Sequence, residues 1–273
     1  MRLTAPPVKL AALERGLEVY QPSRVRDGSL ASWLSQRQAD FALVAAYGRI
    51  LPPEVLATPA HGCINLHASI LPAYRGAAPI QWAIANGDAE TGVSLMQMDA
   101  GMDTGAVYAV RRLPIPDGMN GGELTRALAE LAADMVGDEL LAAVAGRLQA
   151  LPQDERFASL APPIEKEHLV IDWTLASDCI ARRVRAFAPA PAAFTFAGER
   201  RLKLLEARRG EAVTSEAPGT VLGTHQDALV VACGSGSLEI VRAGAEGKNP
   251  QSGRDLINGR LLRLGQRLAA QPG

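Results

Sequence analysis

The sequence contains little cysteine and no long apolar run. Its three cysteines, Cys63, Cys179 and Cys233, lie far apart and are odd in number, so they supply neither a disulfide framework nor a paired metal site. This usage is typical of a protein of the reducing cytoplasm. No stretch approaches the roughly 20 apolar residues that a membrane span needs, and the first residues lack the apolar region of a secretory signal. We therefore expect a cytoplasmic protein with no membrane partner.

The chain also lacks an excess of charge of one sign. Its 28 basic and 29 acidic side chains give a net charge of −1, which by itself does not indicate a polyanionic partner. The charge is unevenly distributed, however: residues 1–170 carry a net charge of −5 and residues 171–273 a net charge of +4. Hydrophobic residues make up 48% of the 273, enough to bury a substantial core. The composition predicts one large or two modest globular domains, of which the second is basic.

Short apolar runs alternate with helical patterns in the first half. Residues 40–48 and 62–69 have the continuous apolar character of strands buried on both faces, which indicates a parallel sheet covered by helices. Residues 91–99 and 105–115 are close enough in sequence for an antiparallel pair. Apolar residues spaced by three and four make residues 121–147 the clearest helix. This order of elements predicts an α/β domain.

The composition changes in the second half. Residues 151–170 are polar and contain prolines, so we expect an interdomain linker that separates a domain of residues 1–150 from one of residues 171–273. Asp172 is expected to cap a helix over residues 173–187. Short apolar segments then follow at even spacing, with Gly, Asn and Asp between them. Such spacing is typical of a small closed or partly open β-barrel, which we expect to be OB-like.

Polar side chains gather where the second predicted strand ends. Asn65 and His67 are two residues apart, so on a strand they point to the same face, and in open parallel sheets ligands bind outside the carboxyl ends of the strands. Asp103 follows in a tight turn between Gly101 and Gly105. A histidine near a strand end is also commonly a structural hydrogen-bonded residue, and a turn aspartate is commonly a local backbone acceptor. Spacing alone does not decide between these roles.

A longer ordered string surrounds these residues. It consists of Asn65 and His67, then Ser69-Ile70-Leu71-Pro72, then Tyr74-Arg75-Gly76, then Gly101-Met102-Asp103-Thr104-Gly105. This string resembles the formyltransferase family that uses 10-formyltetrahydrofolate, and its one departure from the family hallmark is Ile70 in place of leucine, a volume-conserving change. The resemblance extends over almost the whole chain and includes a second domain. Within the family it is strongest to members that formylate the α-amino group of methionyl initiator tRNA, for translation initiation.

The resemblance implies a fold, a co-substrate and a set of catalytic residues. The fold is a Rossmann-like formyltransferase domain followed by the small barrel, and the co-substrate is 10-formyltetrahydrofolate, with no metal. Asn65 and His67 are expected to donate hydrogen bonds to the formyl oxygen, where negative charge develops during transfer. Asp103 is expected to hold His67 or to accept protons from the amine. The backbone around Ser69, Ile70, Leu71 and Pro72 is expected to line the pterin site.

The resemblance also implies a tRNA-binding surface, because neutralised phosphates supply the sequence-independent part of nucleic-acid affinity. An ordinary solvated face is the alternative for each basic residue taken singly. The candidates are basic residues of the first loop and of the second half: Arg2, Arg182, Arg183, Arg185, Arg201, Lys203 and Lys248. We expect the enzyme to act as a monomer.

Several alternatives stay open from the sequence. Other folate-dependent formyltransferases and a formyltetrahydrofolate hydrolase share the same motifs, and a remnant that binds folate or RNA without catalysis would keep them too. Residues 17–22 are expected to form a strand. Roughly 40 residues of the family pattern are absent from the sequence, and in a doubly wound sheet the missing strands would lie between residues 17–22 and 40–48. We therefore expect a gap in the middle of the sheet and a chain that is poorly soluble or inactive when expressed alone.

Overall fold

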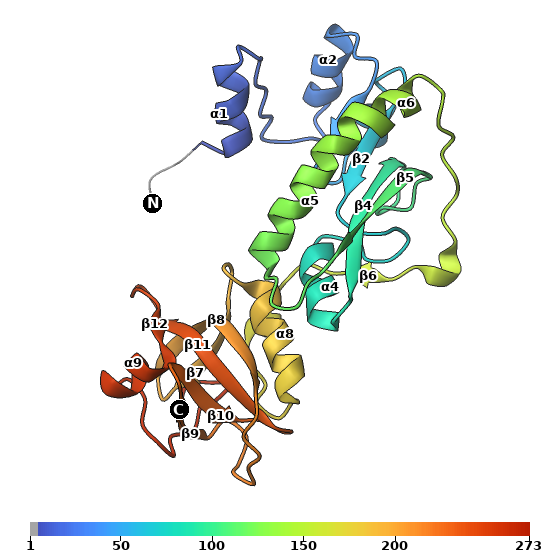
Figure 1. Cartoon of the computed structure of the whole chain (residues 1–273). Helices are drawn as coiled ribbons and strands as arrows, with labels where there is room; N and C mark the ends of the chain where they lie inside the picture. The colour runs from blue at the N-terminus through green and yellow to red at the C-terminus, as the bar shows by residue number, and fades with distance from the viewer. Residues whose placement is uncertain (1–4) are drawn as a thin grey trace.

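The computed structural model describes residues 5–273 (Figure 1), and its first half is built on a four-stranded sheet. The strands are β1 (Ala42–Val44), β2 (Cys63–His67), β4 (Glu90–Gln97) and β5 (Val107–Pro114), in the order β1-β2-β4-β5. β1 and β2 are parallel, with Val44 opposite Asn65, whereas β4 is antiparallel to both β2 and β5. The parallel pair and the antiparallel pair predicted from the sequence are therefore both confirmed, within one mixed sheet.

Helices accompany this sheet. They are α1 (Pro7–Glu14), α2 (Ser29–Gln36), α3 (Pro53–Leu56), α4 (Pro79–Asn86) and α5 (Gly121–Met135), followed by a π-helical turn (Val136–Leu140) and α6 (Leu141–Val144). The predicted helix over residues 121–147 is thus confirmed, with a π turn inside it. Its start is fixed by a capping box, in which the side chains of Asn120 and Glu123 each accept from the other's backbone N–H at 3.0 and 2.9 Å.

Two details of the sequence prediction were wrong. Residues 17–22 form no strand, and β1 is the outermost strand on its side, so the gap expected inside the sheet is a free edge instead. Asp172 does not cap a helix, because α8 (Ser177–Phe187) begins only after Ala176. The Asp172 carboxylate instead accepts from the backbone N–H and the hydroxyl of Thr174, at 2.9 and 2.6 Å. Aspartate commonly forms such a local turn in competition with helix capping.

The polar segment after α6 lies along the first half and contains short regular elements. Leu151 forms a bridge with Val107, and β6 (Leu160–Ala161) pairs in parallel with β3 (Arg75–Gly76). A 3-10 turn (Glu155–Phe157) precedes β6, and α7 (Lys166–Leu169) follows it. These contacts attach the segment to the start of β5 and to the chain that follows β2.

The second half forms a β-barrel. Its strands are β7 (Ala193–Ala197), β8 (Arg200–Gly210), β9 (Val221–His225), β10 (Ala228–Ala232), β11 (Ser237–Ala245) and β12 (Gln251–Ser252), followed by α9 (Gly253–Asn258). The main sheet has the order β7-β8-β11-β10-β9, so β7 and β9 are its edges. The last residues of the chain cover both edges: Ala269 bridges Phe196 of β7, and Arg267 bridges Thr220 just before β9. The barrel expected from the sequence is confirmed.

Helix α8 joins the two halves. It packs against α4 on one side and against β8 on the other (Figure 1). Most buried apolar residues form one core that extends from Ile64 and Leu95 in the first sheet to Phe187 and Phe194 near the barrel. Leu51, Val55 and Cys63 form a separate, smaller cluster. Throughout residues 5–273, no helix is long and apolar enough to cross a membrane.

Candidate active site

Two polar side chains project from the carboxyl end of β2. Asn65 and His67 are both more than nine-tenths buried, although the strand between Cys63 and His67 is otherwise apolar. Because they are two residues apart on a strand, they lie on the same face. Burying polar groups is costly unless they are hydrogen-bonded, so their presence here points to a role other than packing.

Asp103 reaches the same place from the turn between β4 and β5. Its Oδ2 accepts from the backbone N–H of Gly76 at 2.9 Å and lies 3.6 Å from Nδ1 of His67. The turn itself is tight: a Cβ on Gly105 would lie 1.9 Å from the backbone oxygen of Gln97, so only glycine fits there. Asp103 adopts a φ of +56°, a left-handed conformation that non-glycine residues rarely take. The structure therefore brings His67 and Asp103 together, at the end of the strand that carries Asn65.

The two ring nitrogens of His67 lie in different surroundings. Nε2 lies 2.9 Å from the backbone oxygen of Tyr74, which can only accept, so Nε2 carries the hydrogen in this arrangement. The 3.6 Å between Nδ1 and Asp103 is longer than a direct hydrogen bond. Nδ1 therefore lies near the Asp103 carboxylate without forming a direct hydrogen bond to it.

The loop predicted to line the pterin site is held from β4. The hydroxyl of Ser94, which is fully buried, donates to the backbone oxygen of Ser69 at 2.7 Å and accepts from the backbone N–H of Leu71 at 3.0 Å. The Ser69 hydroxyl donates to the backbone oxygen of Ala73 at 2.6 Å. Ser69 and Leu71 are buried, while Ile70 and Pro72 are half-buried. Ser94 was not predicted from the sequence, because nothing local distinguishes it from other strand serines.

Ser159 holds the next part of the same loop. Its backbone N–H donates to the Pro72 oxygen at 3.2 Å, and its own backbone oxygen accepts from the Arg75 N–H at 2.8 Å. Its hydroxyl accepts from the backbone N–H of Tyr74 at 2.9 Å. Sequence reasoning treated this residue as part of a linker and missed the contact, which spans 85 positions of the chain.

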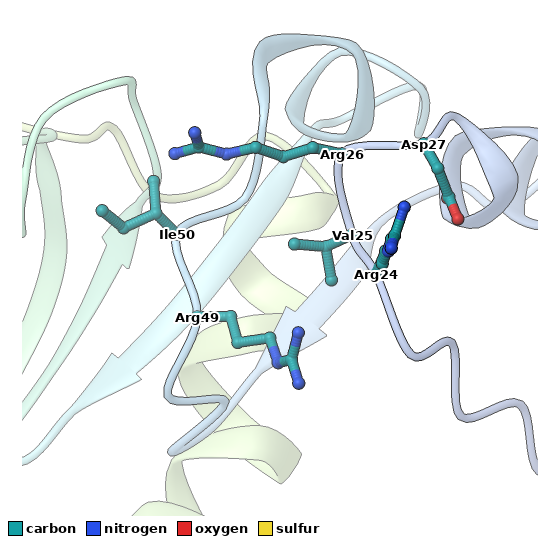
Figure 2. A pocket seen from close by; sticks show the side chains of 6 residues that line it. All are labelled: Arg24, Val25, Arg26, Asp27, Arg49 and Ile50. Atoms are coloured by element: carbon teal, nitrogen blue, oxygen red, sulfur yellow. The ribbon is translucent and has the colours of Figure 1, made fainter.

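A cavity of about 560 Å³ lies beyond the carboxyl end of β1 (Figure 2). Figure 2 shows three arginines, Arg24, Arg26 and Arg49, arranged around Val25, with Ile50 beside them. Asp27 also lines the cavity, but its carboxylate accepts from the N–H and hydroxyl of Ser29, and these hydrogen bonds lower its pKa. The three guanidinium groups extend in different directions, and Nη1 of Arg49 donates to the backbone oxygen of Ser23 at 3.2 Å. The basic lining makes this cavity a candidate site for an anion. Because β1 and β2 are parallel, this cavity lies at the same edge of the sheet as His67.

The basic candidates of the second half occupy different surroundings. Arg182 is half-buried, packs against Gly87 after α4 and pairs with Asp178, so its charge is used within the fold. Arg201 lies 3.7 Å over the Phe194 ring and 3.6 Å from Glu246. Lys248 is exposed. The other candidates, Arg183, Arg185 and Lys203, are half-buried, and Arg2 lies outside the described residues.

Within the described part of the chain, no three His, Cys, Asp or Glu side chains gather as metal ligands do.

Comparisons with known proteins match both halves of the chain. Residues 1–139 match the formyl transferase family model, and residues 163–261 match the formyl transferase C-terminal domain model. The methionyl-tRNA formyltransferase of Sorangium cellulosum is 49% identical over 271 residues, which cover 97% of this chain and 86% of that protein.

Two solved structures share the fold. HypX from Aquifex aeolicus in complex with tetrahydrofolic acid has a TM-score of 0.68 at 22% identity, covering 93% of this chain and 44% of that one. A methionyl-tRNA formyltransferase from Clostridium thermocellum has a TM-score of 0.58 at 19% identity, covering 75% of this chain and 88% of that one. The family resemblance drawn from the motif string is thereby confirmed, and the chain belongs to the formyl transferase family.

Proposed function

We propose that this chain transfers a formyl group from 10-formyltetrahydrofolate to the α-amino group of methionyl initiator tRNA. The observation that carries the proposal is the meeting of His67 and Asp103, 3.6 Å apart, at the end of the strand that bears Asn65. The 49% identity to the Sorangium cellulosum methionyl-tRNA formyltransferase supports the choice of acceptor. Because initiator tRNA is charged and used in the cytoplasm, we place the enzyme there, acting as a monomer.

Asn65 and His67 stabilise the charge that develops during transfer. When the amine attacks the formyl carbon, negative charge builds on the formyl oxygen. The Asn65 amide and, in the imidazolium form of the ring, an N–H at Nδ1 of His67 supply donors on the same strand face. Donors that are fixed before the reaction lower its barrier, and losing one such donor typically costs about 3 to 4 kcal/mol.

Asp103 takes part in the proton balance. A C–N bond forms between the amine and the formyl carbon while the bond from that carbon to the donor nitrogen breaks. The attacking amine loses a proton, and the folate nitrogen that gave up the formyl group gains one. The Asp103 carboxylate lies beside His67, and it accepts the amine's proton directly or through water.

The arginine cavity suits the anionic part of a folate. The glutamate of a folate carries two carboxylates, and Arg24, Arg26 and Arg49 present three guanidinium groups on one cavity. We place this glutamate at these arginines and the pterin against the backbone of residues 69–72, which Ser94 holds in place. Both positions lie at the carboxyl edge of the sheet, as the reaction requires.

The barrel and α8 offer the basic surface for tRNA. Lys203 and Lys248 form no ion pair within residues 5–273, whereas Arg182 and Arg201 have intramolecular partners. We place tRNA phosphates at Lys203 and Lys248, together with Arg183 and Arg185 on α8.

A panel of acceptors tests this function. The protein is incubated with 10-formyltetrahydrofolate carrying a radiolabelled formyl group and, in separate reactions, with methionyl initiator tRNA, methionyl elongator tRNA, an amino-sugar nucleotide or water alone. We expect label on methionyl initiator tRNA at a rate at least about a hundredfold above every other acceptor. Transfer only to the amino sugar, or release of formate only, would replace this function with that of another member of the family. Binding of folate or tRNA without any transfer would identify a non-catalytic remnant.

A further inference from the structure

Gln153 connects the turn that carries Asp103 to the loop after β2. Its side-chain Nε2 donates to the backbone oxygens of Asp103 and Gly105, both at 2.8 Å. Its Oε1 accepts from Nε and Nη2 of Arg75, at 3.0 and 2.8 Å. A glutamine amide has two N–H donors and one oxygen with two lone pairs, so every hydrogen-bonding position of this side chain is occupied. All hydrogen-bonding positions of this half-buried amide are used by the Asp103 turn and by Arg75. Gln153 therefore holds these two parts of the structure together.

The turn needs such support. Asp103 holds a φ of +56°, a conformation that persists in non-glycine residues only where the surroundings enforce it. One enforcing contact is the hydrogen bond from the Gly76 N–H to its carboxylate. The other comes from Gln153, which binds the carbonyl of Asp103 itself. Rotation of this peptide would redirect the carboxylate away from His67.

Gln153 is itself held firmly on its other side. Arg75 is buried, and it binds both carboxylate oxygens of Glu155 at 2.7 and 2.9 Å in addition to Gln153. A bidentate guanidinium–carboxylate pair fixes the plane of both groups. Since Gly76 follows Arg75 directly, the two sides of the Asp103 turn are tied to the same dipeptide. The contacts form a closed ring through Asp103, Gln153, Arg75 and Gly76.

We propose that Gln153 is a positioning residue for formyl transfer: it holds the backbone of the Asp103 turn so that the carboxylate faces His67. This inference rests on the proposed function and adds a residue that touches neither substrate. Gln153 acts on the reaction only through Asp103. Its contribution therefore belongs to the chemical step and not to the binding of folate or tRNA.

Two substitutions separate the two ends of the side chain. Gln153→Glu keeps an oxygen for Arg75 but places a second oxygen against the carbonyls of Asp103 and Gly105. Gln153→Met has a similar volume and loses both interactions. We expect each variant to lower kcat by about 10- to 100-fold, with the KM for each substrate changed by less than about threefold. Gln149→Met is the matched control, because Gln149 lies exposed in the same segment.

A double-mutant cycle completes the test. Asp103→Asn and Gln153→Met are combined, and single-turnover rates and thermal unfolding are measured for all four proteins. If Gln153 acts through Asp103, adding Gln153→Met to Asp103→Asn lowers the rate by less than about twofold further. A further tenfold loss would overturn the proposal, as would wild-type kcat in Gln153→Glu. Failure of the wild-type protein to formylate any acceptor would instead overturn the proposed function.

Discussion

Oδ2 of Asp103 lies 3.6 Å from Nδ1 of His67, although His67 ends strand β2 and Asp103 lies in the turn between β4 and β5. The separation leaves Nδ1 available to a reacting group while keeping a carboxylate within one proton-transfer step. The position of Asp103 depends on the glycines of its turn and on the N–H of Gly76. In the proposed mechanism, formyl transfer therefore depends on the backbone geometry of this turn as well as on the two side chains.

Removal of the Asn65 amide should slow transfer without unfolding the protein. In Asn65→Ala we expect kcat to fall by about 10²- to 10³-fold, because a donor to the developing oxyanion is removed. Steady-state kinetics and circular dichroism on the same preparation provide the measurement. Asn258→Ala is the control, since Asn258 lies exposed at the end of α9. If Asn65→Ala were as active as Asn258→Ala, Asn65 would have no role in catalysis.

Local patterns in the sequence predicted where three candidate residues lie: Asn65 and His67 on one face of a strand, and Asp103 in a turn flanked by glycines. Their catalytic roles were implied only by the resemblance to the formyltransferase family and stay a prediction. Ser94, Gln153 and Ser159 could not be predicted, because their contacts join segments up to 85 residues apart and their residue types are ordinary. The arginine cavity was missed for the same reason, since Arg49 meets Arg24 and Arg26 only after folding.

In the fold, too, locally encoded elements could be predicted from the sequence, whereas long-range contacts could not. Strong periodicity identified the helix that begins at Gly121, and even spacing of short strands identified the barrel. The last residues of the chain, which cover both edges of the barrel, have no apolar period that would reveal this role. Asp172 was misassigned because aspartate serves equally well as a helix cap and as the start of a turn.

Ser94 should support both stability and folate binding. Ser94→Ala removes a donor to the Ser69 oxygen and an acceptor for the Leu71 N–H in a fully buried site. We expect a loss of about 1 to 3 kcal/mol in the free energy of unfolding, measured by urea denaturation. The KM for 10-formyltetrahydrofolate should rise, because the loop over residues 69–72 is less well held. An unchanged KM in a destabilised variant would show that this loop does not contact the co-substrate.

Glu239 should make the barrel sensitive to acid. Burial raises the pKa of its carboxyl, but hydrogen bonds from His225 and Arg208 outweigh burial, so the pKa lies below its ordinary value. A lowered pKa in the folded state means that the ionised group stabilises the protein at neutral pH and that this stabilisation is lost as the pH falls below about 4.5.

The pH dependence of unfolding provides the measurement. Glu239→Gln should lower Tm at pH 7, and the difference from wild type should shrink as the pH is reduced toward 3. Glu206→Gln is the control, since Glu206 is exposed on β8. A difference in Tm that is constant with pH would contradict the role of the ionised carboxylate.

Lys203 and Lys248 should strengthen tRNA binding through their charge. In the double variant Lys203→Ala, Lys248→Ala we expect weaker binding of initiator tRNA and a shallower slope of log Kd against log salt, by about one for each phosphate that is no longer neutralised. Folate binding should stay unchanged, because both residues lie on the barrel side of the molecule. The matched control is Lys166→Ala, because Lys166 is exposed on α7, outside the strands of the barrel. An unaltered salt slope would move the tRNA surface elsewhere.

The most direct test of the catalytic site is the single-turnover rate of formyl transfer to methionyl initiator tRNA in Asp103→Asn. This substitution keeps the volume of the side chain and removes the carboxylate that faces His67. With both substrates saturating and thermal unfolding unchanged, we predict a rate at least about a hundredfold below that of the wild-type protein. A folded Asp103→Asn protein that transfers formyl groups at nearly the wild-type rate would contradict a catalytic role for this carboxylate.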